Sequence, residues 1–273
     1  MTEIPTTLAG RVLIIAGSDS GGGAGIQADI KAVSALGGYA ATAIAALTAQ
    51  NTQGVFGILD IPPAFIRQQI DLVLDDIGAD AIKTGMLSRP EAIGEVVAAL
   101  KDRSPRIPLV VDPVMVAKGG RKLLDDAAHD ALIHHLLPMA TILTPNLPEA
   151  EALTGRTISG VEDMIAAGRS LVDMGARSVL VKGGHLPGPR LVDVLVGPEG
   201  VRTFEGDRIA TSSTHGTGCT LASAIATGIA QGLTLGDAVD RARRYVALAI
   251  RTAPGLGGGH GPLNHIHTVR PFR

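Results

Sequence analysis

The fold is indicated most directly by the segment Val12-Leu13-Ile14-Ile15-Ala16-Gly17-Ser18-Asp19-Ser20-Gly21-Gly22-Gly23-Ala24-Gly25. Its first part is a short apolar run, which is typical of a β-strand covered on both faces. Its second part is rich in glycine, and a pattern of helical period follows at 25–36. A strand, a tight turn and a helix in this order begin a βαβ unit, so the segment predicts a parallel sheet.

The same alternation continues along the chain. Short apolar runs predict strands at Val12–Ile15, Thr42–Leu47, Ala81–Lys83, Leu109–Val111, Thr141–Leu143 and Val179–Val181. Helical patterns occur at 25–36, 65–77, 90–102, 126–137, 161–174, 217–231 and 236–252. Two strand-like runs within 191–204 predict an antiparallel hairpin at a sheet edge. We therefore expect a single α/β domain over residues 1–273, with a doubly wound, mainly parallel sheet, helices on both faces and a small antiparallel edge hairpin.

The composition excludes several classes of protein. Hydrophobic residues make up 45% of the 273 residues and charged residues 18%, which is incompatible with intrinsic disorder. With 24 Lys and Arg, 26 Asp and Glu and only 2% aromatic residues, we expect no nucleic-acid partner. No apolar stretch reaches about 18 residues and no signal peptide is apparent, so we expect no membrane segment. The single cysteine suits a reducing compartment, and we expect a cytoplasmic protein.

Glycine and polar residues follow the ends of the predicted strands. They form the segments 17–25, 50–51, 83–86, 112–115, 144–149 and 182–185. In open α/β sheets, ligands bind outside the carboxyl ends of the strands. Together these segments predict one ligand site, although any one of them alone would be a weak signal.

The glycines after the first strand allow two interpretations. The run Gly23-Ala24-Gly25-Ile26-Gln27-Ala28 matches the G-x-G-x-x-A fingerprint of dinucleotide binding. That fingerprint also needs an acidic residue at the end of the next strand, where residues 48–51 supply none. A tight turn between strand and helix is the simpler interpretation, and a dehydrogenase is disfavoured. The phosphate-binding motif G-x-x-x-x-G-K-[ST] is also absent, so any nucleotide would need another phosphate cradle.

A candidate for that cradle is Thr214-His215-Gly216-Thr217-Gly218-Cys219-Thr220, directly before a helix of small residues. Backbone N–H groups at a helix N-terminus bind anions, and glycine leaves the approach open. In the first turn of a helix, the pKa of the Cys219 thiol is expected to fall. The alternative is a small buried cysteine without chemistry, and both interpretations remain open at this point.

Four charged side chains stand at candidate positions. Asp29 lies on the apolar face of its predicted helix, so its carboxylate needs a partner or a ligand. Asp112 and Glu149 follow two strands and could share a Mg²⁺ ion. Lys182 follows a further strand and could neutralise phosphate charge. Each also has an ordinary explanation, namely a loop hydrogen bond, a turn residue, a first-turn helix acid and a snorkelling lysine, respectively.

These motifs together resemble those of the hydroxymethylpyrimidine/phosphomethylpyrimidine kinases of thiamine biosynthesis, which are members of the ribokinase-like superfamily. The resemblance extends from Val12 to about His267, nearly the whole chain. It rests on the ordered motifs at 16–29, 49–52, 83–87, 112–115, 144–150, 182–185, 215–220 and 259–267. So many motifs in one order make the match highly specific.

The resemblance implies ATP-dependent phosphorylation of 4-amino-5-hydroxymethyl-2-methylpyrimidine to its monophosphate, and then to the diphosphate. It implies that Asp29 and Gln50 hold the pyrimidine, in a pocket lined by Gly17, Met86 and Val114. A glutamine amide suits a ring that offers both an acceptor nitrogen and an amino donor.

The resemblance also implies the groups for phosphoryl transfer. It gives Mg²⁺ to Asp112 and Glu149, and the nucleotide to Asn146, Lys182 and Thr217. The catalytic group that it implies consists of Lys182 and the anion hole Gly216, Thr217, Gly218 and Cys219.

The general base is open, because Cys219 stands where many superfamily kinases carry an aspartate. Loose phosphoryl-transfer transition states need mainly positioning and charge neutralisation. We therefore expect the anion hole to contribute more than the thiol.

Two other functions compete with this one. A pyridoxal or pyridoxine kinase would also act on a hydroxymethyl group of a six-membered heteroaromatic ring, but Gln50 and the 17–25 loop favour the pyrimidine. A non-catalytic module that senses pyrimidines is disfavoured because Asp112, Glu149 and Lys182 are all present. Members of the resembled family are commonly dimers, so we expect a homodimer.

Overall fold

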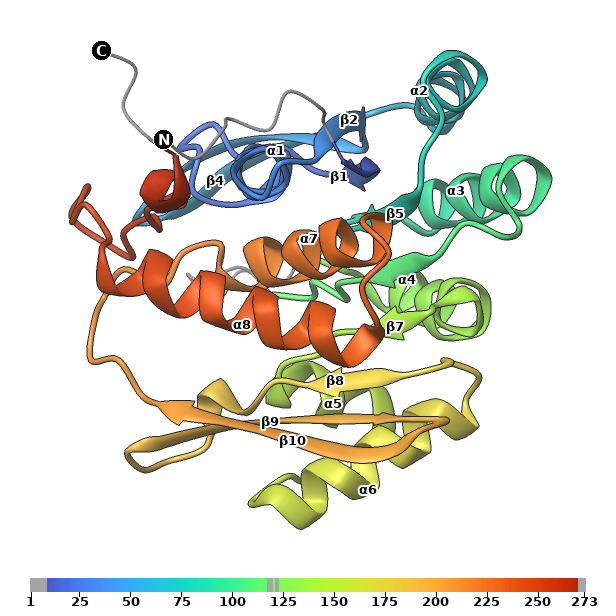
Figure 1. Ribbon diagram of the computed structural model, residues 1–273. Helices are drawn as coiled ribbons and strands as arrows, with labels where there is room; N and C mark the ends of the chain where they lie inside the picture. Colours follow the sequence, from blue (N-terminus) through green and yellow to red (C-terminus); the bar gives the residue numbers. More distant parts are fainter. Residues whose placement is uncertain (1–8, 117–119, 121–122, 270–273) are drawn as a thin grey trace.

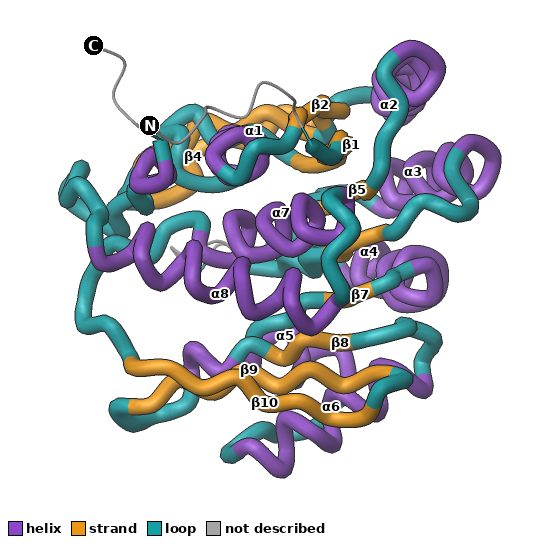
Figure 2. The backbone as a smooth tube through the Cα atoms, in the orientation of Figure 1, coloured by secondary structure: helices purple, strands orange, loops and turns teal. Residues whose placement is uncertain are grey.

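The computed structural model describes residues 9–116, 120 and 123–269. Its strands are β1 (Arg11–Ala16), β2 (Tyr39–Ile44), β3 (Ala46–Asn51), β4 (Gly54–Asp60), β5 (Ala81–Thr84), β6 (Leu109–Val111), β7 (Ile142–Leu143), β8 (Val179–Val181), β9 (Arg190–Gly197) and β10 (Gly200–Asp207). Its α-helices are α1 (Gly25–Ala35), α2 (Pro63–Asp76), α3 (Pro90–Arg103), α4 (Asp126–Ala131), α5 (Leu147–Thr154), α6 (Val161–Asp173), α7 (Thr217–Ala230) and α8 (Leu235–Arg251). Figure 2 shows how strands and helices alternate along the backbone.

Eight strands form one sheet in the order β10-β9-β8-β7-β6-β5-β1-β2 (Figure 1). The strands from β8 to β2 run parallel to their neighbours. β9 is antiparallel to β8, and β10 is antiparallel to β9. The predicted sheet is thus confirmed, including the antiparallel hairpin at one edge.

Helices cover both faces of the sheet, as the short apolar strands require. In β1, Val12 and Ile14 pack into a core with α1, α7 and α8, while Leu13 and Ile15 pack into a second core with α2 to α6. Successive side chains of a strand point to opposite faces, so one apolar run serves both cores. Figure 1 shows α7 and α8 side by side in front of the sheet.

The predicted strand at Thr42–Leu47 is two strands in two different sheets. β2 ends at Ile44, and the chain continues into β3, which pairs with β4 in a separate antiparallel sheet. β4 was not predicted from the sequence. The pairing shifts register between Ala49 and Gln50, which is a β-bulge. The apolar run is continuous across Ala45, so composition alone did not mark the point where the chain leaves the main sheet.

The predicted helix at 126–137 is also shorter than expected. α4 ends at Ala131 and is followed by a π-helical turn at Leu132–Leu136 and a 3₁₀ turn at Leu137–Met139. Pro138 lies in that last turn, and a proline cannot donate the backbone hydrogen bond that an α-helix would need there. None of the helices in the described part of the chain combines the length and the apolar character that a membrane span requires.

Candidate active site

A cavity of about 1530 Å³ opens at the carboxyl ends of the parallel strands. Its walls come from the loops after β1, β5, β6, β7 and β8, from β3, and from the start of α7. The cavity brings together every site residue predicted from the sequence except Asp29. Those that line it are Gly17, Gln50, Met86, Asp112, Val114, Asn146, Glu149, Lys182, Gly216, Thr217, Gly218 and Cys219.

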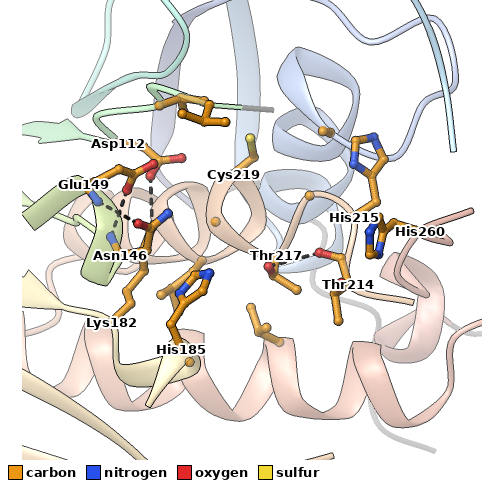
Figure 3. Close-up of a pocket in the computed structure, with 18 of the residues that line it drawn as sticks. Asp112, Asn146, Glu149, Lys182, His185, Thr214, His215, Thr217, Cys219 and His260 are labelled. Atoms are coloured by element: carbon orange, nitrogen blue, oxygen red, sulfur yellow. Dashed lines mark hydrogen bonds and ion pairs between the residues drawn. The ribbon is translucent and has the colours of Figure 1, made fainter. Parts of the chain in front are cut away.

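One end of the cavity carries two buried carboxylates and a lysine (Figure 3). Lys182 Nζ lies 3.1 Å from Asp112 Oδ1. Glu149 is the third residue of α5, where its carboxylate accepts a 2.8 Å hydrogen bond from the Asn146 N–H. Asn146 returns the contact by accepting from the Glu149 N–H, which makes a capping box. The helix start therefore holds Glu149 beside Asp112.

The charges at this end are mutually dependent. Burial raises the pKa of Glu149 to about 7, and the Asp112 carboxylate adds to the rise while Lys182 opposes it. Burial works against the charge of Lys182, but Asp112 and Glu149 outweigh it and raise the pKa of the lysine. The lysine thus stays cationic, while a second negative charge beside Asp112 is costly near neutral pH.

The acidic pair fits a divalent cation. Asp112 Oδ2 is buried and has no hydrogen-bond partner among the residues that the structure describes. Such an orphaned carboxylate oxygen needs a ligand. Within the described ranges, no three His, Cys, Asp or Glu side chains gather as a complete metal cage. Two carboxylates without a cage suit Mg²⁺, which usually takes one or two carboxylates and completes its shell with water and phosphate oxygens.

The N-terminus of α7 lines the middle of the cavity, between the acidic end and the end that contains Gln50. Gly216 precedes the helix with φ of 78°, and a Cβ on it would collide with the Gly23 carbonyl. Glycine is therefore required there. A Cβ on Gly218 would stand 3.4 Å from Lys182 Nζ and 3.6 Å from Asp112 Oδ2, so this residue faces the acidic end. The first N–H groups of a helix lack partners within it and are available to an anion.

Cys219 lies in the first turn of α7, between the acidic end and His215 (Figure 3). The side chain is half-buried. Burial raises the pKa of its thiol to about 12, and the nearby Lys83 ammonium offsets only part of this. The expectation of a lowered thiol pKa is therefore wrong, because loss of water outweighs the helix N-terminus.

Asp29 does not line the cavity. It is fully buried in α1, and both of its oxygens lie 2.8–2.9 Å from Lys83 Nζ of β5. The Ser223 hydroxyl of α7 donates to it at 2.7 Å. This corrects the expectation that Asp29 holds the pyrimidine: its carboxylate instead joins α1, β5 and α7 beneath the site. Asp29 outweighs the burial of Lys83 and raises the pKa of that lysine, which remains charged.

The opposite end of the cavity contains Gln50, from β3, next to the β-bulge. The Gln50 backbone is fixed to the β1–α1 loop, since its N–H donates to Ser20 Oγ and its carbonyl accepts from that hydroxyl, both at 2.8 Å. Met86 lies beside Gly17, where a Cβ would press on the Met86 methyl group. This end of the cavity thus places the side-chain amide of Gln50 near Gly17 and Met86.

Sequence reasoning missed four buried polar residues around the site, namely Asp19, Thr48, Lys83 and His215. All four lie in or next to the segments at the strand ends or before α7, which were singled out for other residues. A signal existed for Lys83, since a lysine that ends an apolar strand and an aspartate on an apolar helix face can neutralise each other. No local signal identified the partner of His215, which is Asp19, 196 positions away.

A parallel sheet whose strand ends gather two carboxylates, a lysine and a glycine-rich helix N-terminus is the arrangement of a small-molecule phosphotransferase. The phosphomethylpyrimidine kinase family model matches residues 19–264, and the chain belongs to this family. Its fold is ribokinase-like.

The chain is 54% identical over 264 residues to the thiamine biosynthesis bifunctional protein ThiED of Geobacter sulfurreducens, covering 97% of this chain and 54% of that protein. It thus spans about half the length of that relative. It is 47% identical to the hydroxymethylpyrimidine/phosphomethylpyrimidine kinase of Rhizobium meliloti, covering 93% of this chain and 96% of the relative. Among solved structures, the ADP complex of Bacillus subtilis pyridoxal kinase is similar, with a TM-score of 0.87, 36% identity, and coverage of 94% of this chain and 98% of that one.

Proposed function

We propose that this protein phosphorylates 4-amino-5-hydroxymethyl-2-methylpyrimidine with ATP, and then phosphorylates the monophosphate to the diphosphate. The observation that carries the proposal is one cavity with two chemically different ends. Gln50 offers a donor and an acceptor at one end, and Asp112, Glu149 and Lys182 offer phosphate chemistry at the other. The α7 N-terminus lies between them, where a phosphoryl group would pass from donor to acceptor.

In this proposal the chain's own residues act mainly by position and charge. Gln50 holds the ring, so that the hydroxymethyl group points toward Gly218 and Cys219. Lys182 neutralises charge on the nucleotide phosphates, and Asn146 and Thr217 contact the nucleotide. The N–H groups at the start of α7 stabilise the oxygens of the group in transfer, and such preorganised dipoles usually make the largest single contribution.

Mg²⁺ at Asp112 and Glu149, when bound, would neutralise the phosphate oxygens and orient them. The carboxylates contribute by accepting that charge, since their own repulsion is relieved by a cation. The Asn146 cap keeps Glu149 in place before the ion arrives.

Cys219 contributes as a backbone donor rather than as a base. With a pKa of about 12, its thiol is protonated at neutral pH and is a poor proton acceptor. This supports the view that the anion hole matters more than the side chain.

The direct test follows products by mass spectrometry. The purified protein is incubated with ATP, Mg²⁺ and the pyrimidine alcohol, and we expect the monophosphate first and the diphosphate later. Absence of both products with a folded protein would reject the function.

A vitamin B6 kinase is a second candidate, because the Bacillus subtilis pyridoxal kinase has so similar a structure. A competition assay compares the two substrates: the pyrimidine alcohol and pyridoxal are offered together, and the phosphorylated products of each are quantified. We expect the pyrimidine to dominate in kcat/KM. A larger kcat/KM for pyridoxal would make the protein a vitamin B6 kinase first and a pyrimidine kinase second.

We also propose that the protein acts in the cytoplasm as a homodimer. On the separate β3–β4 sheet, Phe56 is 67% exposed and Leu59 63% exposed. Two exposed apolar side chains of this size on one short strand favour contact with another chain. Sedimentation of the wild type and of Phe56→Glu should give a dimer and a monomer, respectively.

A further inference from the structure

A buried hydrogen bond between a histidine and a carboxylate joins the two glycine-containing loops that form the site. His215, directly before the anion hole, places Nε2 at 2.8 Å from Oδ2 of Asp19 in the β1–α1 loop. The two residues are 7% and 1% exposed, respectively. The function proposed above uses neither side chain, so their role in the site is open.

The hydrogen positions in this pair follow from its surroundings. Asp19 also accepts backbone N–H groups from Gly21, Gly23 and Ala24, at 2.8–3.0 Å. These donors and His215 lower the pKa of Asp19 against the effect of burial, so the group is a carboxylate. A carboxylate only accepts hydrogen bonds. His215 Nε2 must therefore carry a hydrogen, and that hydrogen is directed at Asp19.

The side-chain amide of Gln50 lies between this histidine and Thr48. In the structure the amide nitrogen of Gln50 lies 3.2 Å from His215 Nε2, and the amide oxygen lies 3.1 Å from the Thr48 hydroxyl. The Thr48 hydroxyl donates its hydrogen to the Ser18 carbonyl at 2.8 Å. Thr48 therefore offers the amide an acceptor. His215 Nε2 carries a hydrogen that Asp19 accepts, so it has no lone pair to offer and can only share that hydrogen.

An amide keeps its shape when its oxygen and nitrogen exchange places, and these two neighbours favour the exchanged orientation. In that orientation the oxygen faces His215 and shares the Nε2 hydrogen with Asp19, and the NH₂ group faces the Thr48 oxygen. Without this exchange two donors would meet at His215, and the Thr48 hydroxyl could donate to the amide oxygen only by giving up the Ser18 carbonyl. One N–H and one oxygen lone pair of Gln50 then remain for a ligand in the cavity that this residue lines.

We infer that Asp19, His215 and Thr48 are positioning residues that fix the orientation of the Gln50 amide, and that they thereby determine selectivity for an aminopyrimidine over the corresponding pyrimidinone. A 4-amino ring offers an acceptor nitrogen beside an amino donor, whereas a 4-oxo ring offers a donor N–H beside an acceptor oxygen. In the two rings the donor and the acceptor therefore exchange positions. An amide that cannot reverse matches only one of them.

The test compares two substrates in each of several variants, and it rests on the proposed pyrimidine kinase activity. The substrates are 4-amino-5-hydroxymethyl-2-methylpyrimidine and its 4-oxo analogue, and the readout is the ratio of their kcat/KM values. For the wild type we expect a ratio of about 100 or more in favour of the amino compound.

Two variants release the amide from opposite sides. His215→Phe keeps a ring but removes the donor, while Asp19 retains its three backbone partners. Thr48→Val keeps the shape but removes the hydroxyl. Each should lower the selectivity ratio about tenfold or more, since the reversed amide no longer meets a mismatched neighbour. His215→Gln, whose amide nitrogen can reach the position of Nε2, should restore much of the ratio.

The matched control is His265→Gln. His265 is also a buried histidine, and its Nε2 lies 3.0 Å from the hydroxyl of Thr220 in the first turn of α7, but it does not contact Asp19 or Gln50. This variant should leave the ratio unchanged even if its stability falls. An equal loss of selectivity in the control would show general loosening of α7 and would overturn the inference.

The remaining outcomes separate the inference from the function on which it rests. If the wild type phosphorylates neither ring, the proposed function fails and the inference fails with it. If the wild type is selective but His215→Phe and Thr48→Val keep the full ratio, the inference alone fails. If His215→Phe does not fold, an unchanged ratio in Thr48→Val is sufficient to reject it.

Discussion

Replacing Glu149 by glutamine is expected to make the ligand-free protein more stable above neutral pH while making it less active. The folded-state pKa of Glu149 is raised to about 7 from an ordinary value of 4.5. When the carboxyl is ionised in both states, this difference corresponds to roughly 3 kcal/mol against folding. The penalty is absent below the unfolded pKa, grows as the pH rises, and is complete above the folded pKa.

Glutamine keeps the shape and can still accept the Asn146 N–H, but it has one acceptor oxygen instead of two. The Met115 N–H also donates to the carboxylate, and its loss costs about 1 kcal/mol at any pH. The net effect of Glu149→Gln is therefore near zero at pH 5 and about 2 kcal/mol of added stability at pH 8. Urea unfolding in the presence of a chelator measures both values.

The matched control is Glu151→Gln, the same chemical change on the same helix. Glu151 accepts from the Ile158 N–H and does not line the cavity, so this variant should show the same small effect at both pH values. A Glu149→Gln protein that is less stable than the wild type at pH 8 would refute the reasoning. Kinase activity should fall and need more Mg²⁺, and an unchanged Mg²⁺ titration would remove Glu149 from the metal site.

Three further outcomes are expected. Cys219→Ser should keep much of the turnover number. Gly218→Val should lower it by a factor of about 10² or more, because the larger side chain fills the space before Lys182. Equal losses in steady-state assays would support the thiol as the general base. Gln50→Leu should raise KM for the pyrimidine about tenfold or more with little change in KM for ATP, since it leaves ring groups unpaired at roughly 1–3 kcal/mol each; equal effects on both would indicate a folding role. Lys83→Met should lower the free energy of unfolding by about 3–5 kcal/mol, because it leaves the Asp29 carboxylate buried without a countercharge. In urea unfolding, the double variant with Asp29→Leu should recover most of this stability. No recovery would contradict the argument from the buried charge.

The parallel sheet could be predicted because each buried strand is a short apolar run between helical patterns. The run at 42–47 shows the limit of this signal: it contains the end of β2 and the start of β3, and nothing in its apolar character marks their separation. β4 escaped prediction because Gly54 and Gly57 interrupt its pattern. Its pairing with β3 is a tertiary property that no local periodicity records.

The position of the site could be predicted because polar residues at the ends of parallel strands must meet at one edge. The partner and the pKa of each group could not be predicted. Asp29 needed a partner, but the choice between a ligand and Lys83 depends on a contact 54 positions away. The local rule for a helix N-terminus predicted an acidic Cys219 thiol, and burial by distant segments reversed the sign.

The placement of β3 and β4 outside the main sheet bears on how such an enzyme can diverge. In the part of the chain that the structure describes, the strand that carries Gln50 is not paired with β6, β7 or β8, which lead into the segments of Asp112, Glu149 and Lys182. Mutations in this hairpin can therefore accumulate without disturbing the register of the phosphoryl-transfer half. The register of the main sheet and the strand that carries Gln50 can in this sense change separately, while the contacts of Gln50 with Ser20 and His215 still link that strand to the loops of the main sheet.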